Sequence, residues 1–220
     1  MLFVGRQSEK KIIMEALNCG RNIILGGKFG IGRTRLIREI AKLVNKRRFI
    51  FVDFGQTPGK MSEKVMKALG IPRRFKNQTQ QMGYKSMRYR IANVTLTKED
   101  KTVIVLDNIA KITAAKKLFL RYLVLEQRFQ FVAIVESVLP PGDLAHLKAH
   151  LWPVDILSLR NLKTSDVISL MRIYSQKHHL NWSDKHIHDL SGIINGYPLN
   201  MIKMIDDINK GDREKRLIPR

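Results

Sequence analysis

A glycine-rich loop constrains the fold of this chain more than any other sequence feature. It matches the pattern G-x-x-x-x-G-K-[ST] at every fixed position except the lysine, which is Arg33. A short apolar run at 22–25 precedes the loop, and an apolar stripe at helical spacing follows it over 36–44. We therefore expect a strand, a tight turn and a helix whose N-terminus and backbone N–H groups bind phosphate. The loop residues are Gly27, Lys28, Phe29, Gly30, Ile31, Gly32, Arg33 and Thr34.

Arg33 is the departure from this pattern. Lysine carries a compact charge on a flexible stem, whereas arginine presents a wider planar fork that fits phosphate oxygens differently. The alternative interpretation is a glycine-rich strand–helix turn that binds no ligand. The flanking strand and helix favour the phosphate loop, and the candidate nucleotide-binding residues are 27–34 with Arg35.

A second element of the same kind of site ends an apolar run at 103–106, where Asp107 and Asn108 follow. A carboxylate at the end of such a buried strand helps to hold Mg²⁺ in phosphate-transferring enzymes. We expect Thr34 and Asp107 to be the magnesium ligands, and Asp107 and Asn108 to be the catalytic positions. Hydrolytic ATPases of this type usually have glutamate where Asn108 stands, and an amide cannot act as a base. A plain buried strand ending in an Asp-Asn turn would be preferred if the glycine loop were absent.

The remaining pattern alternates strands and helices up to residue 160. Short apolar strands are expected at 22–25, 49–52, 102–106, 131–135 and 154–157, with helices between them. Continuous apolar strands separated by helices indicate an α/β fold with a parallel sheet covered on both faces. Helices without strands follow at 165–177, 184–194 and 198–209. We expect a nucleotide-binding domain over 1–160 and a helical subdomain with a basic tail over 161–220.

Composition indicates the class of partner. Hydrophobic residues make up 44% of the 220 residues, which is enough to form a core. The formal net charge of +21 indicates a polyanionic partner. The single cysteine, Cys19, excludes an internal disulfide. The N-terminus does not have the pattern of a signal peptide, and no apolar run is long enough to span a bilayer. We expect a cytoplasmic protein, in contact with the nucleoid if it binds DNA.

Basic residues concentrate at 71–91, where acidic residues are absent and aromatic residues are interleaved. Cations neutralise phosphates and aromatic rings stack on bases, so this segment is the candidate nucleic-acid surface, for DNA rather than RNA. The alternative is a solvated helix face. The candidate nucleic-acid-binding residues of this segment are Arg73, Arg74, Lys76, Lys85, Arg88 and Arg90.

With these motifs the chain resembles the AAA+ and STAND superfamily of P-loop ATPases. The resemblance includes Phe3-Val4-Gly5-Arg6, the loop at 27–34, the strand at 103–108, Glu136-Ser137 and Gly196-Tyr197-Pro198-Leu199. It implies ATP or ADP with Mg²⁺, a helical lid, and Gly5 and Arg6 near the adenine. It also implies a nucleotide-dependent homo-oligomer on DNA that recruits a protein partner, as in small transposition and replication-initiation ATPases.

Four features that this resemblance would lead us to expect are missing. Arg33 replaces lysine, Asn108 replaces glutamate, and Leu199 stands where an arginine is common. The segment 138–152, which often holds an arginine finger, has only His146, Lys148 and His150 as its basic residues. We expect an ATP-binding switch with weak or absent hydrolysis. Two alternatives stay open: a DNA-stimulated ATPase completed by a partner subunit, and a non-enzymatic nucleic-acid-binding module on a relic P-loop fold.

Overall fold

The computed structural model describes residues 3–72, 82–94, 101–125, 127–178 and 180–217, with only the backbone described at 101 and 208–217. The chain forms two compact units. The α/β unit comprises Ser8–Gly27 and Arg33–Ser158, and the helical unit comprises Met1–Gln7, Lys28–Gly32 and Leu159–Arg220. The helical unit therefore also includes the N-terminal residues and the central part of the glycine loop. The predicted division at residue 160 stays a prediction.

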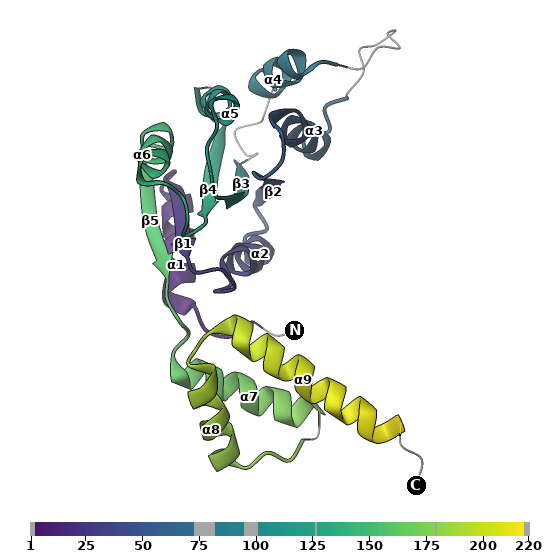
Figure 1. The fold of residues 1–220 in the computed structure, drawn as a ribbon. Helices are drawn as coiled ribbons and strands as arrows, with labels where there is room; N and C mark the ends of the chain where they lie inside the picture. The colour runs from purple at the N-terminus through teal and green to yellow at the C-terminus, as the bar shows by residue number, and fades with distance from the viewer. Residues whose placement is uncertain (1–2, 73–81, 95–100, 126, 179, 218–220) are drawn as a thin grey trace. The chain divides into compact units, whose positions relative to one another are not determined.

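A five-stranded parallel sheet forms the centre of the α/β unit (Figure 1), so the predicted fold class is confirmed. The strand order is β2-β3-β4-β1-β5, which puts β1 between β4 and β5. Register pairs Ile23 with Val132 and Leu25 with Ile134 along β1 and β4. The strands are β1 (Asn22–Gly27), β2 (Arg47–Asp53), β3 (Lys101–Ile109), β4 (Phe129–Val135) and β5 (Val154–Leu159).

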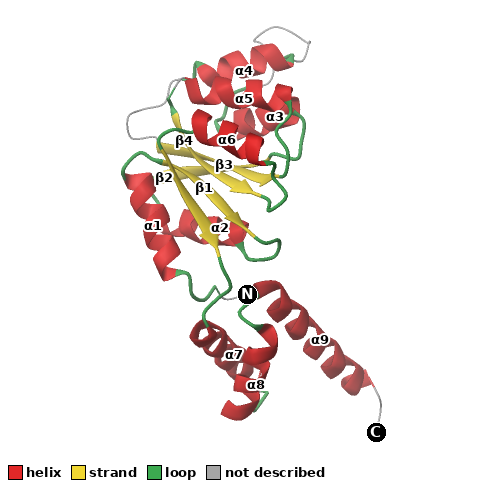
Figure 2. Ribbon diagram, turned by 60° about the vertical axis from the view of Figure 1, so that its left-hand side comes forward, coloured by secondary structure: helices red, strands yellow, loops and turns green. Residues whose placement is uncertain are grey.

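Helices cover both faces of the sheet (Figure 2). The connection from β1 to β2 runs in the opposite direction across the sheet from the later connections. Since crossovers between parallel strands are right-handed, α2 lies on one face and α3 to α6 lie on the other. The helices of this unit are α1 (Gln7–Asn18), α2 (Arg33–Leu43), α3 (Pro58–Ala68), α4 (Tyr84–Ala92), α5 (Ala114–Leu125) and α6 (Pro141–His150).

The core of the α/β unit forms where apolar strands meet apolar helix stripes. Val103, Ile104 and Leu106 on β3 are all 0% exposed, as the uninterrupted apolar run predicts for a central strand. On α2, the stripe formed by Leu36, Ile37 and Ile40 is also fully buried. These two elements therefore hold Arg33 and Asp107 on rigid supports.

The helical unit contains α7 (Thr164–His178), α8 (Asp184–Ile194) and α9 (Pro198–Leu217). Its own apolar cluster includes Val167, Met171, Ile187 and Met201. Among the described residues, no helix combines the length and the hydropathy needed to cross a lipid bilayer.

Candidate functional site

The predicted magnesium ligands meet in the α/β unit. Thr34 is in the first turn of α2, and Asp107 is near the carboxyl end of β3. The hydroxyl Oγ1 of Thr34 donates to Oδ1 of Asp107 at 3.0 Å. Hard oxygen donors of this kind are the ligands that Mg²⁺ takes in proteins, so the donor set fits a magnesium ion. The partners are 73 positions apart in the chain and are brought together by the sheet.

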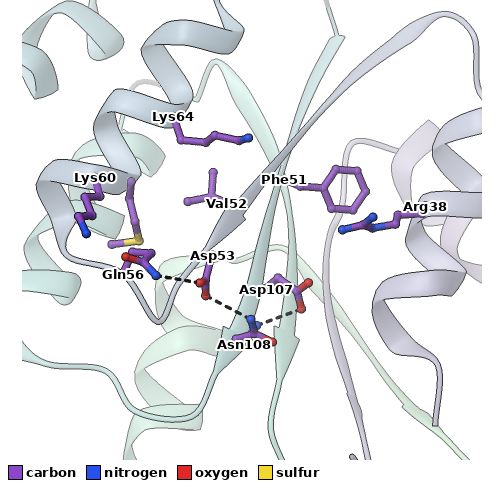
Figure 3. A pocket seen from close by; sticks show the side chains of 10 residues that line it. Arg38, Phe51, Val52, Asp53, Gln56, Lys60, Lys64, Asp107 and Asn108 are labelled. Atoms are coloured by element: carbon purple, nitrogen blue, oxygen red, sulfur yellow. Dashed lines mark hydrogen bonds between the residues drawn. The ribbon is translucent and has the colours of Figure 1, made fainter. Parts of the chain in front are cut away.

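Asn108 follows Asp107 in a left-handed conformation, with φ of 61°. The pairing of β3 with β4 shifts register between Leu106 and Ile109, which marks an irregularity around Asn108. Its backbone N–H donates to Oδ1 of Asp107 at 3.0 Å, and its side-chain amide donates to Oδ1 of Asp53 at 3.2 Å (Figure 3). The amide at the predicted catalytic position thus binds the neighbouring strand.

Asp53 ends β2 and accepts several hydrogen bonds. Burial on its own would raise the pKa of this carboxyl, but the Gly55 N–H and the side chains of Gln56 and Asn108 donate to it. Together with the positive charge of Lys116, these donors hold the pKa of Asp53 below its ordinary value. Asp53 is therefore a stable anion beside the Asp107–Asn108 turn.

The guanidinium of Arg33 is hydrogen-bonded to other residues of the protein. Its Nη2 donates to both carboxylate oxygens of Glu136 at 2.7 Å, and its Nη1 donates to the carbonyl oxygen of Val135. The side chain of Arg33 is only 6% exposed. The expected contact of Arg33 with phosphate stays a prediction. The sequence interpretation named Glu136-Ser137 only as part of a family resemblance and did not foresee that the Glu136 carboxylate binds Arg33.

The central part of the loop, Lys28–Gly32, belongs to the helical unit. Arg6, 7% exposed, donates from Nη2 to the carbonyl oxygen of Ile31 at 3.3 Å. Arg6 therefore supports the loop backbone, and its expected proximity to adenine stays a prediction. Gly5, its neighbour, has φ of 77°, and an added Cβ would lie 2.6 Å from a carboxylate oxygen of Asp166.

Other loop residues contact the start of α9 within the same unit. The hydroxyl of Tyr197 donates to the carbonyl oxygen of Phe29, whose side chain is 71% exposed. Gly30 has φ of 77°, and a Cβ there would lie 2.8 Å from Cβ of Leu199. Leu199, the residue in place of the expected arginine, thus packs against the loop backbone. Lys28 is exposed, whereas Arg35, in the α/β unit, is half-buried on α2.

A cavity of about 530 Å³ opens beside Asp107 and Asn108 at the carboxyl end of β2 (Figure 3). Three exposed cations line it: Arg38 from α2, and Lys60 and Lys64 from α3. The sequence interpretation missed these residues, although the i, i+4 spacing of Lys60 and Lys64 puts both on one helix face.

The predicted nucleic-acid residues have different environments. Arg73, Arg74 and Lys76 lie outside the described residues. On α4, Lys85 is exposed, whereas Arg90 donates to the carbonyl oxygen of Pro72 at 3.1 Å.

Arg88 on α4 packs inward instead. The carbon at the centre of its guanidinium lies 3.5 Å from the ring centroid of Tyr122 and 5.5 Å from that of Tyr84. Such a contact is a cation–π interaction with the aromatic face. Tyr84, one of the interleaved aromatics, is thus partly engaged within the protein.

No protein-family model matches the chain, and no curated protein matches it. Solved structures do match, and they share the AAA+ P-loop ATPase fold. Orc1 of Aeropyrum pernix in complex with DNA is 15% identical with a TM-score of 0.58, over 80% of this chain and 50% of that chain. RuvB of Thermotoga maritima is 14% identical with a TM-score of 0.60, over 96% and 65%.

A Walker-type ATPase of Pyrococcus abyssi is 12% identical with a TM-score of 0.60, over 89% of this chain and 65% of that chain. The chain thus spans between 50% and 65% of the length of these three structures. The similarity establishes that the chain has the same fold as these three structures.

Proposed function

We propose that this chain is an AAA+-like ATP-binding protein that acts on or with DNA. Nucleotide with Mg²⁺ serves as an assembly or conformational switch, and hydrolysis is weak or absent. The hydrogen bond between Thr34, in the first turn of α2, and Asp107, near the carboxyl end of β3, carries the proposal, because it brings together the two expected magnesium ligands. Ligands of open parallel sheets bind outside those strand ends. The proposed setting is a cytoplasmic homo-oligomer that forms with nucleotide and recruits a protein partner.

Weak hydrolysis is supported by the chemistry of the residues near Asp107. Asn108 offers an amide, which cannot take a proton from an attacking water, and this amide already donates to Asp53 at 3.2 Å. Arg33 is engaged with Glu136, and Leu199 carries no charge to offer to a phosphate. The protein is thus better equipped to hold a nucleotide than to cleave it.

The DNA role is supported by charge. A nucleotide site uses few cations, and most of the net charge of +21 lies elsewhere. Polycationic surfaces bind the phosphate backbone of nucleic acids. Among proteins of the same fold, Orc1 of Aeropyrum pernix is described in complex with DNA.

Isothermal titration with ATP and ADP, in Mg²⁺ and in EDTA, tests the nucleotide site. The wild type should bind ATP more tightly with Mg²⁺, and Thr34→Ala and Asp107→Asn should abolish the advantage of Mg²⁺. Thr164→Ala and Asp189→Asn are matched controls, since both positions are exposed in the helical unit. A wild type that binds no nucleotide with Mg²⁺ would exclude the proposal.

The two alternatives predict different results for phosphate release. A DNA-stimulated ATPase should release phosphate when DNA and a partner subunit are added, and should lose this in Asp107→Ala. A relic nucleic-acid-binding module should bind DNA equally with and without ATP, and equally in Gly32 and Thr34 variants. Light scattering during size-exclusion chromatography, with and without ATP, Mg²⁺ and DNA, tests the assembly switch.

A further inference from the structure

Glu136, the residue after β4, lies beside the start of the glycine loop within the α/β unit. β1 and β4 are parallel, and Leu25 pairs with Ile134. Continuing this register brings Glu136 level with Gly27. A Cβ added at Gly26 would lie 3.6 Å from Cγ2 of Val135, which agrees with this close approach. A carboxylate is therefore held where β1 passes into the loop.

The Glu136 carboxylate already neutralises the cation that the loop motif provides. Nη2 of Arg33 is 2.7 Å from each carboxylate oxygen, and Nη1 is bonded to the Val135 carbonyl. A guanidinium keeps its proton under all ordinary conditions, so the pair is a permanent ion pair as long as Glu136 is ionised. Charge-assisted bonds of this kind are about twice as strong as neutral ones.

Carboxylate and phosphate oxygens compete for the same donors, because guanidinium binds both in the same planar geometry. A phosphate that takes the Nη2 donors of Arg33 must therefore displace Glu136. The two partners differ in exposure: the Arg33 side chain is 6% exposed and that of Glu136 is 20% exposed. Arg33 also donates a hydrogen bond to the Val135 carbonyl oxygen of β4. Glu136 is therefore the partner that can move into solvent.

We propose that Glu136 competes with the phosphate groups of a nucleotide for Arg33 and thereby sets the nucleotide affinity of the loop. This inference rests on the proposed nucleotide binding. The affinity in the wild type is the net result of gaining phosphate contacts and losing the Arg33–Glu136 pair. Removing the charge of Glu136, while keeping its size, should therefore tighten binding.

Glu136→Gln is the decisive variant, with ATP–Mg²⁺ and inorganic tripolyphosphate as probes in isothermal titration. The loss of one competing charge-assisted pair should lower both Kd values about tenfold. In an Arg33→Ala background the same substitution should change Kd less than about twofold, because the shared cation is gone. Glu15→Gln removes one exposed carboxylate from α1 and controls for net charge.

Glu136→Asp provides a second test if Glu136→Gln does not fold, as judged by circular dichroism. Its carboxylate is one methylene shorter and should release Arg33 in part, so binding should again tighten, though less. Unchanged or weaker binding by a folded Glu136 variant, with a wild type that binds ATP, would overturn the competition alone. If neither wild type nor variants bind either probe, both the competition and the proposed nucleotide binding are wrong.

Discussion

At the scale of single residues, the replacement of lysine by Arg33 decides what the first turn of α2 can hold. The planar fork lets one side chain bond to the Val135 carbonyl and to both oxygens of Glu136. An ammonium group has three donors on one atom and cannot reproduce this spread. Arg33 therefore joins the start of α2 to the end of β4, whatever else it binds.

Replacing Arg33 with lysine should destabilise the protein. Losing a buried charge-assisted bond, and leaving Glu136 less well paired, should cost about 1–3 kcal/mol of unfolding free energy. Urea denaturation followed by circular dichroism measures this change. Arg172→Lys is the matched control, because the Arg172–Asp184 pair is exposed and should contribute less than about 1 kcal/mol. Equal stability of Arg33→Lys and the wild type would contradict the structural role of the pair.

Asp53 makes stability depend on pH in a defined direction. Its folded pKa lies below the value of 3.8 that applies without the fold. The folded state thus binds fewer protons than the unfolded state, so Asp53 stabilises the protein above about pH 4, and this contribution is lost as pH falls through the folded pKa. Asp53→Asn should be less stable than the wild type at neutral pH. The urea midpoints of Asp53→Asn and of the wild type, measured from neutral to acidic pH, should converge below about pH 4. A difference between the two proteins that stays constant over this range would contradict the prediction.

At the scale of elements, the glycine at position 30 of the loop is required both by its backbone conformation and by what packs against it. Gly30 combines φ of 77° with an approach that would leave 2.8 Å between an added Cβ and Cβ of Leu199. The first condition disfavours any other residue, and the second excludes the extra atom unless Leu199 shifts. The sequence interpretation includes Gly30 in the loop that binds phosphate, and packing within the helical unit requires glycine there as well.

Gly30→Ala should accordingly lower the unfolding free energy by about 1–3 kcal/mol. Gly59→Ala is the control, because Gly59 is in the first turn of α3 and an added Cβ would meet no atom within 4 Å apart from its chain neighbours and the backbone of its own helix. That substitution should stabilise the protein by about 0.5–1 kcal/mol through helix propensity and chain entropy. Denaturant unfolding of both variants measures the contrast, which would fail if Gly30→Ala were as stable as Gly59→Ala.

At the scale of the whole molecule, the net charge of +21 dominates the interactions expected in solution. Affinity for DNA should fall steeply with salt, since each phosphate that is neutralised releases counterions. Lys85 is exposed on α4 and free to contribute, whereas Arg88 packs against Tyr122. The two residues, predicted together from one segment, should therefore behave differently.

Lys85→Ala should weaken DNA binding and reduce the slope of log K against log salt by about one. Arg88→Ala should instead lower thermal stability, because it removes the contact with Tyr122. Fluorescence anisotropy with a labelled duplex, over a series of salt concentrations, measures the slope. Lys185→Ala on α8 is the exposed control, and an equal effect there would mean that the segment around α4 is not the DNA surface.

The sequence by itself determined the fold class, the order of strands and helices along the chain, and the positions of the glycine loop and Asp107. These properties are encoded in consecutive residues, through apolar spacing and glycine placement, so they can be read without distant partners. The tertiary structure alone decided which side chains meet. Arg33 binds Glu136, 103 positions away, because β4 lies beside β1 in the sheet and its register brings Glu136 level with the loop. Strand order and register arise from packing of the whole core, and no local pattern records them.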